Sequence, residues 1–359
     1  MRVLSLFAAL TTTYVSVFGP IAIAFADDVD VKIMTQNVYE GTNFTELNSA
    51  TTLPAFLGAV TVTYQNILAT RPDIRAGALA QEIAREKPDI VALQEAVILR
   101  SGLVPITNPP TPVATVDVDQ LALVLAALDR LGQPYNPVAI VPNLDAQAPS
   151  SLGISVRITE RTVILVRADH WFDGMRVSNA QVQEYLAILG FPTPIGVSIP
   201  NTRGWASVDV TIDGRSFRLI TTHLEQVQPY NESQATETVQ SAVASTTLPV
   251  VFVGDFNIQA NVPSDPTYAT YQSLLAAGLS DAWEIARHGD PGPTCCQNQN
   301  VMNVTTDLNQ RIDLVLLKGG VGVRDIHLIG NNSSDRVQGF WPSDHAGIVA
   351  TLRIPGRHN

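Results

Sequence analysis

Cysteine is nearly absent from this sequence: the chain of 359 residues has two, Cys295 and Cys296, and they are adjacent. Two cysteines cannot cross-link a chain of this length, so a buried core must provide its stability. Three states of the pair are open: a disulfide between neighbours, which an export compartment permits, two free thiols, or a bridge to another molecule. A structural zinc site is not expected, because there is no second pair of cysteines.

Positive charge and aromatic side chains are also scarce. The chain has 22 Lys and Arg against 33 Asp and Glu, a formal net charge of -11, and only 6% aromatic residues. Proteins that bind nucleic acids by charge alone are usually basic, so this acidity argues against a dedicated DNA- or RNA-binding protein. It argues less against an enzyme, because a bound metal ion supplies positive charge locally. The few aromatics give base stacking no support, although they do not exclude it.

Long apolar stretches are missing except at the start of the chain. Arg2 precedes a mostly apolar segment, which ends in the small-x-small pattern Ala24-Phe25-Ala26 just before Asp27. This pattern predicts a signal peptide over residues 1–26, followed by a mature chain of residues 27–359. The alternative is an uncleaved membrane anchor, since the segment is near spanning length. Cleavage would give a secreted protein, periplasmic or extracellular, that is not an integral membrane protein.

Apolar residues make up 45% of the chain, enough for a large core, and their spacing predicts both strands and helices. Strands are expected at residues 29–37, 89–93, 138–141, 162–166, 205–212, 215–222, 248–253, 311–317 and 346–354, and helices at 53–69, 73–86, 117–131, 232–245 and 267–277. Asp213-Gly214 predicts a two-residue hairpin turn. This mixture favours α/β layers with mixed sheets over a purely parallel barrel.

Helix caps and two stretches without a clear pattern complete this outline. Asp73 is predicted to cap one helix, and Asp117 with Gln120 is similar to a capping box at the start of another. Residues 101–116 are rich in Pro, Thr and Val and are expected to be irregular. Residues 171–200 are interpreted as a surface insertion.

Polar side chains stand at the ends of the expected strands, where a rigid scaffold fixes them. The set is Asn37, Gln94-Glu95, Thr222-His223, Asp255 with Asn257, and Asp344-His345, with Asp313 inside a strand. Their carboxylate and amide oxygens suit magnesium, calcium or manganese rather than zinc. Two histidines provide an acid and a base near neutral pH, and Asp313 is placed to orient one of them. Together they are the groups that hydrolysis of a phosphate ester requires.

The motifs QN at 36–37, LQE at 93–95, THL at 222–224, GDFN at 254–257, RID at 311–313 and SDH at 343–345 resemble those of the endonuclease/exonuclease/phosphatase superfamily, in the same order. That group includes deoxyribonuclease I, abasic-site endonucleases, neutral sphingomyelinases and inositol-phosphate phosphatases. The resemblance implies a four-layer α/β sandwich, in which two mixed β-sheets pack face to face with helices outside. Because the motifs span residues 37–345, it also implies one catalytic domain over residues 27–359.

The resemblance implies a role for each residue. Glu95 would be the main metal ligand, with Asn37 and Asp344 beside it, and the metal would be Mg²⁺, with Mn²⁺ or Ca²⁺ as alternatives. Asp255 and Asn257 would align the attacking water and hold a phosphate oxygen. His345, oriented by Asp313, would act as a base or as a cation on the phosphate, and His223 would contact the phosphate and protonate the leaving oxygen. Arg161 and Arg203 are further candidates for phosphate contacts.

Three functions are consistent with these motifs. The first is a secreted, divalent-metal-dependent phosphodiesterase, nuclease-like, acting on nucleic acid, a phospholipid or a small phosphodiester. The second is a sphingomyelinase-like lipid phosphodiesterase, which would use an exposed apolar loop within residues 104–116. The third is a non-catalytic binding protein on the same fold, which would require Glu95, Asp255 and His345 to lie far apart. No stable protein partner is evident.

Overall fold

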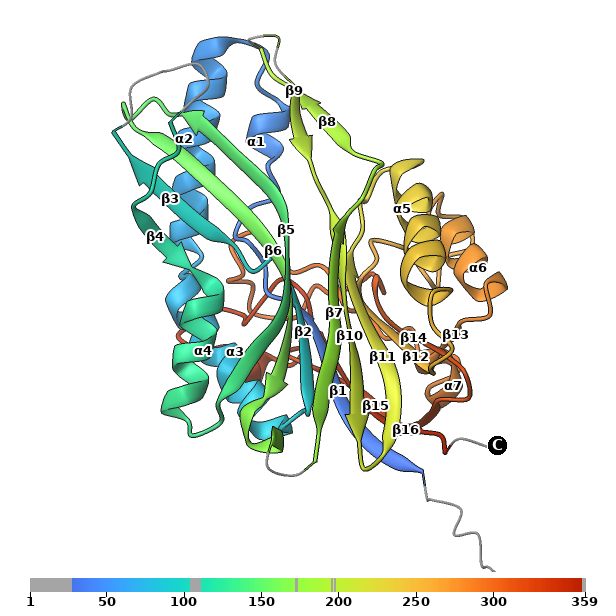
Figure 1. The fold of residues 1–359 in the computed structure, drawn as a ribbon. Helices are drawn as coiled ribbons and strands as arrows, with labels where there is room; N and C mark the ends of the chain where they lie inside the picture. Colours follow the sequence, from blue (N-terminus) through green and yellow to red (C-terminus); the bar gives the residue numbers. More distant parts are fainter. Residues whose placement is uncertain (1–27, 104–110, 172–173, 195, 197, 357–359) are drawn as a thin grey trace, which may run out of the picture.

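The computed structural model describes residues 28–103, 111–171, 174–194, 196 and 198–356 (Figure 1). The predicted signal peptide, residues 1–26, and residues 104–110 of the proposed apolar loop lie outside the described residues. Within the described part of the chain, no helix is both long and apolar enough to cross a membrane.

The larger sheet, sheet 1, has eight strands in the order β15-β16-β1-β2-β6-β3-β4, and β5 also pairs with β6. Its strands are β1 (Val29–Asn37), β2 (Ile90–Gln94), β3 (Ile98–Gly102), β4 (Val116–Asp119), β5 (Tyr135–Pro149), β6 (Ser155–Arg167), β15 (Gly322–Ile329) and β16 (Gly347–Ile354). β1 runs parallel to β2 and antiparallel to β16, so the sheet is mixed.

The second sheet, sheet 2, has six strands in the order β13-β14-β12-β11-β10-β7. They are β7 (Arg176–Glu184), β10 (Gly204–Ile212), β11 (Arg215–His223), β12 (Val250–Asp255), β13 (Ser280–Asp281) and β14 (Asp313–Lys318). Only β11 and β12 pair in parallel. The predicted hairpin turn between β10 and β11 is confirmed: Asp213 and Gly214 both have positive φ, as a tight turn that matches strand twist requires.

The two sheets pack face to face, and helices cover their outer faces (Figure 1). The inner core joins side chains of sheet 1, such as Ile33 and Ile164, to those of sheet 2, such as Phe217 and Val251. Helices α3 (Pro72–Glu86) and α4 (Gln120–Arg130) cover sheet 1, and α5 (Tyr230–Thr238) and α6 (Tyr268–Ala276) cover sheet 2. Strand alternation produces this arrangement, since Ile33 points inward while its neighbour Met34 packs under the helices. The expected four-layer α/β sandwich is confirmed.

Two predicted helix caps are wrong. Helix α3 begins at Pro72 after Arg71, and Asp73 lies in its first turn, paired with the Arg71 guanidinium. Helix α4 begins only at Gln120, because the preceding residues are drawn into sheet 1 as β4. Its cap is Asp119, whose carboxylate accepts the Ala122 N–H at 3.1 Å. Strand pairing with β3 therefore outweighs the local capping-box pattern.

The segment interpreted as a surface insertion, residues 171–200, contributes more than a surface loop. Its first part is β7, the edge strand of sheet 2, and its second part is a hairpin of β8 (Leu189–Pro192) and β9 (Ser198–Asn201). β7 is exposed along most of its length, so its sequence lacks the alternation that marks a strand. The remaining helical elements are α1 (Thr45–Asn48), α2 (Leu53–Ala69), α7 (Ala282–Ala286), the 3₁₀ turns Ala168–Trp171 and Ser333–Asp335, and a π-helical turn at Val239–Val243.

Candidate active site

Strand direction gathers the predicted polar residues at one edge of both sheets. β1 and β2 run parallel, as do β11 and β12, and each pair ends in the polar residues identified from the sequence. β14 runs antiparallel to β12, so Asp313 at its start lies opposite Asp255 at the end of β12. β16 runs antiparallel to β1, which brings the preceding Asp344-His345 to the same edge. The site thus spans the gap between the two sheets.

Asn37 links the sheets at the centre of the site. Its side-chain amide donates to Glu95 Oε1 at 2.8 Å and to Asp255 Oδ2 at 3.0 Å. Glu95 follows β2 with a positive φ of 57°, and its other oxygen accepts the Glu40 N–H at 2.9 Å. A buried amide therefore fixes two carboxylates from different sheets in one cluster.

The backbone before Asp255 requires glycine. Gly254 has φ 143°, and a Cβ at this position would lie 2.1 Å from the Thr222 carbonyl oxygen on β11. The close approach places Asp255 directly beside His223 in the sheet register. Asp255 Oδ1 accepts the Asn257 N–H at 2.9 Å, and the Asn257 amide donates to the Leu224 carbonyl. The GDFN segment is therefore a turn held by its own polar side chains.

His345 is buried and contacts a carboxylate, as expected. Its Nδ1 lies 2.8 Å from Asp313 Oδ2, and its Nε2 lies 3.9 Å from Asp255 Oδ2. Burial lowers the pKa of His345, but the carboxylates of Asp313, Asp344 and Asp255 outweigh it and raise that pKa well above its usual value. The three carboxylates therefore favour the charged form of this imidazole.

His223 also has a carboxylate partner, Glu160 on β6, which the sequence analysis missed. His223 Nδ1 lies 2.8 Å from Glu160 Oε1, and the Arg203 guanidinium donates to Glu160 Oε2 at 2.7 Å. Burial raises the pKa of Glu160, but Arg203 and His223 outweigh burial and lower it to about 2. Burial and Arg203 lower the pKa of His223, yet Glu160 and Asp255 leave it raised overall. One signal was present: Glu160 is a charged residue at an inward-facing position of β6.

The two arginines predicted to contact phosphate have different positions. Arg203 is buried in the site, against Glu160 and His223. Arg161 does not join the cluster, because neighbouring residues of a strand point to opposite faces. Its guanidinium donates to the Ala96 carbonyl at 2.8 Å and to Asp119 at 2.5 Å. Arg161 therefore ties β6 to the loop after β2 and to the cap of α4.

The composition of the cluster fits a divalent cation. Ligand atoms of Glu95, His223 and Asp255 lie within 4.8 Å of one another, as do those of Asp255, Asp313 and His345. Burial and the Glu95 carboxylate raise the pKa of Asp344 to about 7 and that of Glu40 well above its usual value. Oε2 of Glu40 is buried and has no hydrogen-bond partner among the described residues. Such crowding of oxygen ligands with an unsatisfied carboxylate is relieved by a hard cation such as Mg²⁺.

Two neighbouring features hold the Asp344-His345 loop in place. Ser343 donates its hydroxyl to the Asn37 carbonyl at 2.7 Å and accepts the His345 N–H. Cys295 and Cys296 form a disulfide, the first of the three states left open by the sequence, and Cys295 forms a β-bridge with His345. The segment that carries the disulfide therefore lies directly beside a residue of the site.

Comparison with known proteins shows what this chain is similar to. Residues 34–345 match the family model described as "Endonuclease/Exonuclease/phosphatase family". Among curated proteins, tyrosyl-DNA phosphodiesterase 2 of Mus musculus is 24% identical over 221 residues, covering 55% of this chain and 53% of that protein. The corresponding rat protein is 26% identical over 182 residues, covering 44% of each. The chain thus spans about half the length of the curated relatives it matches.

Solved structures show the same fold. The endonuclease/exonuclease/phosphatase of Beutenbergia cavernae has a TM-score of 0.55 at 19% identity, and the alignment covers 91% of this chain and 72% of that one. A family protein of Leptotrichia buccalis has a TM-score of 0.53 at 16% identity, with 90% and 99% covered. At these identities the likeness concerns the fold alone.

Proposed function

Since the chain belongs to the endonuclease/exonuclease/phosphatase family, we propose that it is a divalent-metal-dependent phosphohydrolase that cleaves a phosphodiester bond with water. One observation carries this proposal: two buried histidine–carboxylate contacts, His345–Asp313 and His223–Glu160, flank Asp255. Two such histidines beside an oxygen-rich cluster match the acid, base and cation ligands of phosphate-ester hydrolysis. The curated relatives are named as phosphodiesterases, which supports the same class.

Glu95, Asn37 and Asp344 would hold the cation, and Glu40, whose N–H is bonded by Glu95 and whose Oε2 has no partner among the described residues, is a further candidate ligand. The bound ion, Mg²⁺ with Mn²⁺ or Ca²⁺ as alternatives, supplies the positive charge that neutralises the phosphoryl oxygens in the transition state. Its oxygen ligands favour a hard cation over zinc.

The protein's own groups perform the proton transfers and the orientation of substrate. Asp255, fixed by Asn37 and by the GDFN turn, would accept a hydrogen bond from the attacking water. His345, whose Nδ1 faces Asp313, would present Nε2 as a base or as a cation on the phosphate. His223 would protonate the leaving oxygen, because Glu160 and Asp255 favour its charged form. Arg203 would keep Glu160 ionised.

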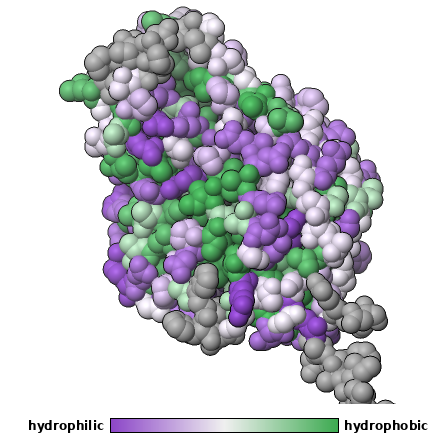
Figure 2. Space-filling view, viewed as in Figure 1, coloured by the Kyte–Doolittle hydropathy of each residue, from purple (hydrophilic) through white to green (hydrophobic). Residues whose placement is uncertain are grey.

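A second candidate, a sphingomyelinase-like lipid phosphodiesterase, is favoured by a separate observation. Leu53, Leu103 and Leu152 are 47%, 85% and 52% exposed. They belong to one end of the molecule. Gly102, the residue before Leu103, pairs with Ser155, which follows the turn that contains Leu152. In the same turn, the Ser151 N–H donates to the Leu57 carbonyl of α2, the helix that begins at Leu53. Figure 2 shows apolar surface at this upper end, beside the atoms drawn in grey. Exposed leucines at one tip suit contact with lipid.

Three further expectations concern a non-catalytic role, export and the extent of the catalytic domain. A non-catalytic binding protein required Glu95, Asp255 and His345 to lie apart, whereas they meet in one cluster. Export remains a proposal, supported by the pattern at residues 1–26 and by the disulfide, because disulfides persist in oxidising compartments. One catalytic domain over residues 27–359 is likewise proposed, since both ends of the chain contribute to one site.

The proposal is tested by hydrolysis of bis(p-nitrophenyl) phosphate, p-nitrophenyl phosphate, plasmid DNA and sphingomyelin vesicles. Each substrate is run with Mg²⁺, Mn²⁺, Ca²⁺ or excess chelator, and with the His345→Ala variant. Metal-dependent cleavage of a diester that the variant loses is expected, and the preferred substrate separates the nuclease-like from the lipid candidate. Full activity in excess chelator would refute the proposal.

A further inference from the structure

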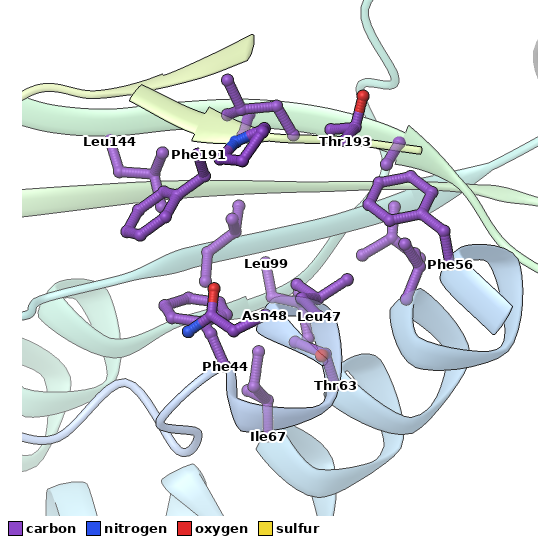
Figure 3. Close-up of a pocket in the computed structure, with 17 residues that line it drawn as sticks. Phe44, Leu47, Asn48, Phe56, Thr63, Ile67, Leu99, Leu144, Phe191 and Thr193 are labelled. Carbon is purple, nitrogen blue, oxygen red and sulfur yellow. The ribbon is translucent and has the colours of Figure 1, made fainter. Parts of the chain in front are cut away.

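An apolar cavity of about 100 Å³ lies between sheet 1 and the helices at the upper end of the molecule. Helices α1 and α2, strands β3, β5 and β6, and the β8–β9 hairpin all contribute to its wall. Figure 3 shows Phe44, Leu144 and Phe191 pointing into it from three different segments. Phe44 and Phe191 are only half-buried, so the cavity is a gap in the packing that opens toward the surface.

The cavity lies close to the active site along β5 and β6. Glu160 and Ile158 are two residues apart on β6, so they share a face and lie about 7 Å apart along the strand. Glu160 contacts His223, and Ile158 lines the cavity. On β5, the Asn143 amide donates to Glu160 at 3.0 Å. The next residue, Leu144, lines the cavity, and both residues lie where the β5–β6 register shifts between Pro142 and Asp145. Two neighbouring strands thus place the cavity next to the His223 side of the site.

The lining of the cavity selects an apolar ligand. Every lining residue is uncharged, and only Asn48, Thr63 and Thr193 carry polar side chains. The Thr63 hydroxyl already donates to Glu46 at 3.0 Å, so it has a partner outside the cavity. An apolar cavity of ~150 Å³ in another protein stays dry and binds benzene. A space of this smaller size matches a short hydrocarbon segment rather than a phosphate, a sugar or a base.

We propose that this cavity is the subsite for an alkyl or acyl arm of the substrate, whose phosphodiester group lies at the active site. The inference rests on the proposed phosphohydrolase function and narrows its substrate class to diesters with one apolar ester group. His223 contacts Glu160, which is two residues from Ile158 in the cavity wall, so the cavity lies on the His223 side of the site.

A series of p-nitrophenyl alkyl phosphates, from methyl to octyl, tests the subsite. The methyl ester reports the proposed hydrolysis itself, whereas the dependence on chain length reports the cavity. We expect kcat/KM to rise about threefold to fourfold per methylene over the first few carbons, the gain that burial of a methylene provides, and then to level off. Cleavage of the methyl ester without any rise along the series overturns the subsite and leaves the phosphohydrolase proposal intact.

Variants that fill the cavity with a larger side chain test the same subsite. Ala146→Phe and Ala148→Phe each place a ring in the cavity from β5. Both are expected to retain wild-type activity on the methyl ester and to lose the gain with chain length. Ala126→Phe, at an exposed position of α4, is the control that should keep the gain. Thermal denaturation identifies a variant that fails to fold, and the other filling variant then provides the result.

A measurement without turnover keeps the two proposals separate. Methyl-, butyl- and hexylphosphonate, which resist hydrolysis, are titrated into the Mg²⁺-loaded protein by calorimetry. The same gain in affinity with chain length is expected, and its absence overturns the subsite even for a protein that cleaves nothing. Long-chain phospholipid in vesicles identifies the source of the arm: cleavage that Ala146→Phe abolishes points to membrane lipid, and cleavage of soluble esters alone points to a small diester.

Discussion

Glu160 in the active site and Glu82 on helix α3 are both buried glutamates, 2% and 3% exposed, yet the protein holds them in opposite states. The pKa of Glu160 is lowered to about 2, so it is ionised at neutral pH. Burial, with the nearby charge of Asp335, raises the pKa of Glu82 to about 8, so it is largely protonated there. Burial is the same in the two regions, and it therefore does not decide the charge.

The partners decide it. Glu160 meets the Arg203 guanidinium, the His223 ring and the Asn143 amide. Neither carboxyl oxygen of Glu82 has a hydrogen-bond partner among the described residues. A buried charge persists where cations and donors compensate its desolvation and disappears where they are missing. The active site is thus a region where this chain maintains charge inside its core, and four predictions test that contrast.

The largest effect is expected from His345→Ala. Loss of an imidazole that would act as a base or as a cation on the phosphate should lower kcat by about 10²- to 10⁴-fold. The Glu82→Gln variant, altered in the other region, should retain wild-type kcat. Steady-state hydrolysis of bis(p-nitrophenyl) phosphate measures both. An equal loss of kcat in the two variants would contradict the distinction between the charged active site and the neutral Glu82 carboxyl.

Glu160→Gln should destabilise the protein by about 3–5 kcal/mol, because it leaves the Arg203 charge buried without its anion. The double variant Glu160→Gln with Arg203→Met removes that charge and should recover part of the loss. Urea denaturation at pH 7 measures both changes. Because the folded pKa of Glu160 lies below its usual 4.5, its stabilisation is present above about pH 4.5 and is lost as the pH falls toward 2.

Glu82 should produce the opposite pH dependence. The pKa of Glu82 is raised from 4.5 to about 8 in the folded state. The free energy of unfolding is therefore highest below pH 4.5 and falls as the pH rises from 4.5 to about 8. The loss should amount to roughly 3–5 kcal/mol, and Glu82→Gln should abolish it. Denaturation midpoints between pH 5 and pH 8 measure the slope. Glu232→Gln, at an exposed position of α5, is the control that should keep the wild-type slope.

The smallest effect is expected from Glu40→Gln. If the unpartnered oxygen of Glu40 faces the cation, its loss should weaken Mn²⁺ binding about tenfold, within the range for groups that support a metal site. Calorimetric titration of Mn²⁺ measures this without turnover. Glu184→Gln, on the exposed edge strand β7, should leave the affinity unchanged. Unaltered affinity in Glu40→Gln would show that this carboxyl, like Glu82, is only a buried neutral group.

Sequence patterns predicted the parts of the molecule that depend on neighbours in the chain. The strand before Asn37 alternates clearly, and the Asp213-Gly214 turn requires only its own two residues, so both were identified correctly. β7 was missed because an exposed edge strand has no buried face to mark in its sequence. The start of α4 was misplaced because β3, which pairs with residues 116–119, is a tertiary partner.

By itself, the sequence determined the family, the layered α/β fold and the order of the polar strand ends, since short motifs and alternation record local backbone geometry. Only the tertiary structure decided which carboxylate faces which histidine. Glu160 and His223 are 63 residues apart and belong to different sheets, so their contact exists only where the sheets face each other. For the same reason Arg203 is inside the site and Arg161 is not, and a cavity built from two helices, three strands and a hairpin is visible only after they pack.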